Sequence, residues 1–61
     1  MNDDLKALAE DLYNEGYMCG IKDGDGWFEA WAMAMRRVCA GEKYHTGLVE
    51  ECFRMMKGNK Q

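Results

Sequence analysis

The sequence contains no proline, no serine and only one threonine among its 61 residues. The absence of serine excludes a Ser-His-Asp catalytic triad. The absence of proline, the residue that most strongly interrupts helices, favours an all-α chain, and 48% of the residues are apolar. No apolar run approaches the ~18 residues that a transmembrane helix needs, so we expect no membrane segment.

The number and context of the cysteines argue against disulfides. Cys19, Cys39 and Cys52 are three in number, so at least one thiol would stay unpaired in a monomer. The acidic start, Met1 to Leu5, lacks the basic and then apolar regions of a signal peptide. We therefore expect a cytoplasmic protein whose thiols are reduced and buried.

The small size of the chain limits its stability. A domain of about 60 residues buries only ~60% of the surface that its unfolded chain exposes. A lone monomer is therefore marginal, and a metal, disulfides, a second copy or a partner would have to stabilise it.

The spacing of apolar residues predicts a compact three-helix domain over residues 1–61, with helices at about 3–22, 27–40 and 47–57 and a frayed tail at 59–61. In the first helix Leu5, Leu8, Leu12 and Cys19 form an apolar stripe, with the acidic residues on the opposite side. Asn2 is a suitable N-cap for this helix.

Glycines mark the predicted turns. Gly16, Gly20 and Gly24 recur every fourth residue, which favours a smooth strip for the close approach of another helix and continuation of the first helix to Lys22. The segment 23–26, Asp-Gly-Asp-Gly, breaks the chain, and Asp25 or Gly26 can cap the second helix. That helix has a wide apolar face with Met33 and Arg37 on its outer side, and Gly41 fits its C′ position.

No metal, cofactor or catalytic site is predicted. Aligning Gly26 with the glycine of a calcium loop puts Ile21 first and Ala32 last, so both essential ligands are missing. Cys19, Cys39, His45 and Cys52 could supply zinc ligands, but no two of them have knuckle spacing. His45 could pair with the thiol of Cys39 or Cys52, yet three short helices offer no substrate cleft. We expect a protein that is not an enzyme.

Charge is divided between the two halves of the chain. Residues 1–29 carry eight acidic and two basic side chains, a net charge of −6, while residues 30–61 carry three acidic and six basic side chains, a net charge of +3. The first helix could present a carboxylate face to a basic protein surface, or that face could simply be solvated. The candidate acidic contacts are Asp4, Glu10, Asp11 and Glu15. The basic half offers an alternative nucleic-acid surface, consisting of Arg36, Arg37, Lys43, Arg54 and Lys57.

Aromatic and methionine side chains are abundant for so short a chain, with seven rings and six methionines. They could fill one small core. The stripes of the first and third helices are too narrow to cover the second, however, so a dimer seam or a partner surface is favoured. Tyr13 and Tyr17 are the candidate aromatic contacts, because tyrosine is enriched at interface centres.

The whole chain is short, acidic, proline-free and free of catalytic motifs. In this general character it resembles small phage-encoded accessory proteins, including inhibitors of bacterial defence of the anti-CRISPR kind. The resemblance implies a protein of the bacterial host cytoplasm that occludes a surface of a larger host-defence or nucleic-acid-handling complex. The sequence alone leaves two alternatives, a small nucleic-acid-binding regulator and an antitoxin-like protein that is ordered only in complex.

Overall fold

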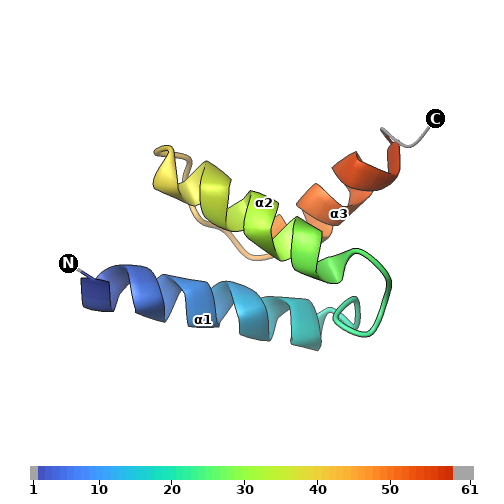
Figure 1. Ribbon diagram of the computed structural model, residues 1–61, viewed down its shortest axis with the longest axis horizontal. Helices are drawn as coiled ribbons and strands as arrows, with labels where there is room; N and C mark the ends of the chain where they lie inside the picture. The colour runs from blue at the N-terminus through green and yellow to red at the C-terminus, as the bar shows by residue number, and fades with distance from the viewer. Residues whose placement is uncertain (1, 59–61) are drawn as a thin grey trace.

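The computed structural model describes residues 2–58 and contains three helices, with no strand in that range. They are α1 (Asn2–Met18), α2 (Trp27–Cys39) and α3 (Leu48–Gly58). Helices α1 and α2 lie side by side and run in opposite directions, and α3 packs against α2 and slants away from α1 (Figure 1). The predicted all-α, three-helix fold is confirmed. The predicted frayed tail at 59–61 and the N-cap side chain of Asn2 lie outside the described residues.

Helix α1 ends at Met18, four residues before the predicted end at Lys22. Gly20 adopts a left-handed conformation with φ 78°, which a continuing helix cannot contain. Its N–H bonds the carbonyl of Tyr17 at 3.1 Å, and the N–H of Ile21 bonds the carbonyl of Gly16 at 3.2 Å. These two bonds define a Schellman motif, in which a C′ glycine closes the helix and satisfies its last carbonyls.

The three glycines of the predicted strip serve three different purposes. At Gly16 a Cβ atom would lie 3.3 Å from Cε3 of Trp27 and 3.6 Å from Cγ1 of Val49. This glycine therefore provides close packing, but against a tryptophan ring and a valine side chain, not against a helix backbone. Gly20 ends α1, and Gly24 lies in the turn before α2. The prediction of one continuous glycine strip is wrong because the chain turns at its middle member.

The ends of α2 follow the predicted glycine positions. Gly26 is its N-cap residue, with φ 87°, so the capping position falls to Gly26 and not to Asp25. At the other end Gly41 has φ 107°, and its N–H bonds the carbonyl of Val38 at 3.0 Å. The N–H of Glu42 reaches the carbonyl of Arg37 at 3.0 Å and completes a second Schellman motif. The predicted C′ role of Gly41 is confirmed.

The shared core is small, and α3 contributes most of its bulk. Among the described residues, six apolar side chains have no exposed surface, and the alanines in this group come from α2, which lets its neighbours pack close to its backbone. Met33 packs against this core, although it was predicted on the outer side of α2. Leu5 and Cys19 were predicted on the inner stripe of the first helix, but both are exposed, and Cys19 lies beyond the end of α1. The six core residues are Leu12, Ala30, Ala34, Leu48, Val49 and Cys52.

Replacing Gly20 tests where α1 ends. A Cβ atom at this position would meet no atom within 4 Å, so Gly20→Ala acts through the backbone alone. We expect the free energy of unfolding to fall by about 1 kcal/mol, because alanine is strained in the left-handed region. Urea denaturation followed by circular dichroism measures the change, with Gly24→Ala as the control, whose φ is not left-handed. If α1 instead continued to Lys22, Gly20→Ala would increase stability.

Candidate protein-binding surface

Four aromatic side chains of α1 and α2 form a continuous series of ring contacts, and Tyr17, one turn after Tyr13, completes what is here called the aromatic surface. Tyr13 meets Trp27 edge to face, with ring centroids 5.0 Å apart and planes at 78°. Trp27 lies 6.3 Å from Phe28 and 6.5 Å from Trp31, and these last two rings stack at 5.4 Å. The aromatic surface consists of Tyr13, Tyr17, Trp27, Phe28 and Trp31.

The antiparallel arrangement of α1 and α2 brings these rings together. Tyr13 and Tyr17 are one turn apart near the C-terminal end of α1, and Trp27, Phe28 and Trp31 lie in the first turns of α2. These two helix ends are neighbours because only a short connection separates them (Figure 1). The indole Nε1 of Trp31 donates a hydrogen bond of 3.1 Å to the carbonyl of Ala9, which fixes α2 on α1.

Much of this aromatic area faces solvent. Tyr17 is 65% exposed, Phe28 62% and Tyr13 42%, while the two tryptophans are half-buried beneath them. The alternative in which all rings fill one core is therefore wrong. Three large rings on one side of a small protein are instead available for contact with another surface.

The acidic residues of α1 do not form the single face that was predicted. Glu15 is buried, with 7% of its surface exposed, so its assignment to an exposed acidic face is wrong. It lies seven residues after Leu8 and three after Leu12, which places it on the packed side of the helix. The Tyr44 hydroxyl donates a 3.3 Å hydrogen bond to its Oε1 atom, while Oε2 has no hydrogen-bond partner.

Burial and the neighbouring acids also affect Tyr44. Burial of its hydroxyl, and then the negative charges of Glu15 and Asp11, raise the pKa of Tyr44 above the usual value for tyrosine. The neutral phenol is therefore the form that this site favours, and it is the form that can donate to Glu15.

The other three predicted acidic contacts are exposed, on two sides of α1. Glu10, Tyr13 and Tyr17 follow i, i+3, i+7 spacing and share one face, so Glu10 borders the aromatic surface. Asp4 and Asp11 are seven residues apart and lie on the side that contains Glu15. Among these three acids, Glu10 is therefore the one placed to contact a partner on the aromatic surface.

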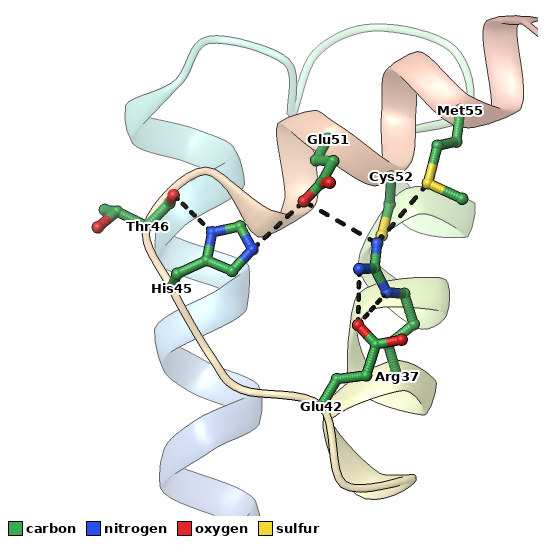
Figure 2. Close-up of polar contacts among 7 residues, drawn as sticks. All are labelled: Arg37, Glu42, His45, Thr46, Glu51, Cys52 and Met55. Carbon is green, nitrogen blue, oxygen red and sulfur yellow. Dashed lines mark hydrogen bonds and ion pairs between the residues drawn. The ribbon is translucent and has the colours of Figure 1, made fainter.

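The predicted basic contacts are partly neutralised within the chain. The Arg37 guanidinium contacts Oε1 of Glu42 through Nη2 at 2.6 Å and Nε at 2.8 Å, and its Nη1 lies 4.0 Å from Glu51 (Figure 2). Arg37 is half-buried beside α3, not on the outer side of α2 as predicted. Arg54 pairs with Glu50 at 3.5 Å. Arg36, Lys43 and Lys57 are exposed.

Arg37 connects α2, the 42–47 connection and α3. Its Nη1 approaches Sγ of Cys52 at 3.5 Å and Sδ of Met55 at 3.7 Å, and Figure 2 shows both sulfur atoms beside the guanidinium. The hydrogen bonds to Glu42 and then to Cys52 raise the pKa of Arg37 further above its ordinary value. Glu51, which Arg37 approaches, is also contacted by His45, whose Nε2 lies 3.3 Å from its Oε1 atom. These contacts of Arg37 hold α2, the 42–47 connection and α3 together.

Three sequence hypotheses about cysteine can be compared with this geometry. All three cysteines are free, but only Cys52 is buried, so the predicted burial of Cys19 and Cys39 is wrong. Partial desolvation of its sulfur, followed by the negative charges of Glu50 and Glu15, raises the pKa of the exposed Cys19 thiol. The contacts of His45 are with Thr46 and Glu51, not with a thiol. Within residues 2–58, no three histidine, cysteine, aspartate or glutamate side chains come together as metal ligands.

Comparison with protein-family models, curated proteins and solved structures gave no match. The function is therefore inferred from the aromatic surface and the charges around it. None of the helices described has both the length and the apolar content of a membrane span.

Charge reversal at Glu15 and at Asp11 tests whether the first is buried and the second exposed. We expect Glu15→Lys to lower the free energy of unfolding by about 3 kcal/mol, because the new ammonium would be desolvated on the packed side of α1 and could not accept the hydrogen bond from Tyr44. Asp11→Lys, one turn earlier and exposed, should change it by less than about 0.5 kcal/mol. Thermal unfolding monitored by circular dichroism gives both values. Equal effects of the two substitutions would contradict the burial of Glu15.

Proposed function

We propose that this protein is a small binding inhibitor or modulator that occludes a surface of a larger protein complex through its aromatic surface. The observation that carries this proposal is the exposure of Tyr13 and Phe28 in one continuous ring cluster, with the exposed Tyr17 one turn after Tyr13. A host-defence or nucleic-acid-handling complex of a bacterial cell, as the resemblance to phage-encoded inhibitors implies, is the class of target that we propose.

Ring packing prepares these side chains for binding. Tyr13 is held against Trp27, and Phe28 is stacked on Trp31, so both rings already have restricted conformations. A side chain that is ordered before binding loses less entropy when the partner arrives. Tyrosine and tryptophan are also the types that most often dominate binding energy, with contributions of about 2 kcal/mol or more at a buried centre.

Electrostatics favour a basic partner. The chain has a net charge of −3, and the exposed acid nearest in register to the two tyrosines is Glu10. Asp4 and Asp11 add exposed negative charge on another side of α1. Acidic charge around an aromatic centre would speed association with a basic surface and make the association rate fall with salt.

The alternative of nucleic-acid binding receives less support from the geometry. Arg37 and Arg54 already pair with glutamates, so two of the five predicted contacts are partly neutralised. Four of the five residues of the aromatic surface lie in the acidic half of the sequence, residues 1–29. A second copy of the chain is the other candidate occupant of the aromatic surface.

The proposal is tested by truncating the two most exposed rings of the aromatic surface. Immobilised wild-type chain is used to capture a protein from bacterial lysate, and the captured protein is purified for affinity measurements. We expect the Tyr17→Ala/Phe28→Ala double variant to bind it at least about 30-fold more weakly, corresponding to about 2 kcal/mol.

The control is Leu5→Ala, which removes an exposed apolar side chain of α1 outside the aromatic surface. It should bind the captured protein as the wild type does. Equal binding by all three chains would contradict the proposal. A concentration-dependent dimer in light scattering that the double substitution abolishes would assign the aromatic surface to self-association instead.

A further inference from the structure

The aromatic surface holds a positive charge that belongs to the chain itself. The Nζ atom of Lys22 lies 3.7 Å from the ring centroid of Tyr13, 5.3 Å from that of Tyr17 and 5.9 Å from that of Trp27. All three distances fall within the ~6 Å over which a cation is attracted to the face of an aromatic ring. We name these three rings, Tyr13, Tyr17 and Trp27, the ring cage.

The ring cage has the geometry of a site for an ammonium group. Tyr13 and Trp27 stand at 78° to each other and form a corner, and Tyr17 follows Tyr13 by one turn. An ammonium in such a corner interacts with several ring faces at once, as in the aromatic cages that bind methylated lysine. The cage is open to solvent on the side of Tyr17, which is 65% exposed.

Lys22 enters the ring cage because of the turn that ends α1. The left-handed Gly20 reverses the chain direction, and the bond from Ile21 N–H to the Gly16 carbonyl holds the reversal. The next residue is Lys22, whose four-carbon side chain lies back over the final turns of the helix that it follows. Among residues 2–58 the ion pairs do not include Lys22, so the rings are its electrostatic partners.

We propose that the ring cage binds the ammonium group of a lysine side chain on the partner protein, and that Lys22 is an internal occupant that this lysine displaces. This inference rests on the proposed function and names the chemistry that the aromatic surface recognises. Lys22 is suited to the role because its side chain is long and flexible and carries no competing ion pair. A tethered ammonium competes with an external one at a high effective concentration. Removing it should therefore strengthen binding of the external group.

The test uses tetramethylammonium and N-acetyl-lysine methylamide as probes and follows the ring protons of the ring cage by NMR. In Lys22→Met, which keeps an unbranched apolar chain, we expect both probes to bind about tenfold more tightly than in the wild type. Adding Tyr17→Leu, which keeps apolar area but removes one ring, should abolish the gain. Lys57→Met is the matched control and should behave as the wild type.

The inference is overturned if neither probe shifts the ring protons of folded Lys22→Met, or if Tyr17→Leu leaves the shifts unchanged. Circular dichroism confirms that each variant is folded. The probes report on the ring cage without any partner, so failure to capture a protein would count against the proposed function alone. Capture that depends on the aromatic surface, combined with no probe binding, would reject the ring cage and leave the proposed function standing.

Discussion

The contact between Trp27 and Gly16 determines how α1 and α2 fit together. The absent side chain of Gly16 lets the indole lie where a Cβ atom would be only 3.3 Å from it. From this position Trp27 supports Tyr13 on one side and lies close to Phe28 and Trp31 on the other. Within residues 2–58 the core contains six fully buried apolar residues, and the ring cluster adds apolar contact beyond it. The half-buried tryptophans that join α1 to α2 thus support Tyr13 and Phe28, which remain exposed for binding.

The helices were predictable because their apolar spacing and glycine signals are local. Gly41 as a C′ residue and the break at 23–26 follow from the sequence alone, and the structure has both. The end of α1 was missed, although a glycine followed by the apolar Ile21 is the usual pattern of a Schellman motif. In the sequence, a glycine at position 20 is compatible with a helix–helix contact and with the end of a helix. The direction of the chain after Gly20 distinguishes these two roles.

The positions of Glu15 and Arg37 were harder to predict because they depend on where the third helix packs. Each lies on the same face as a buried position of its own helix, since Glu15 follows Leu12 by three residues and Arg37 follows Ala34 by three. Both residues were predicted to be exposed because they are charged, although this spacing places them beside buried residues. The 42–47 connection places Tyr44 in contact with Glu15 and Glu42 in contact with Arg37. No periodicity in the sequence predicts the path of that connection. Tyr13 and Tyr17 were predicted as contacts, but their relation to Lys22 depends on the turn at Gly20.

The central claim is that the aromatic surface is already assembled in the free protein. NMR of the unmodified chain tests it most directly, through the chemical shift of the Lys22 ε-methylene protons. Nuclear Overhauser contacts between the rings of Tyr13 and Trp27 complete the measurement. Because Lys22 Nζ lies over the Tyr13 ring, the account predicts strong upfield shifts of these protons together with contacts between the two rings. Methylene shifts at the values of an unstructured lysine, with no contact between the rings, would contradict it.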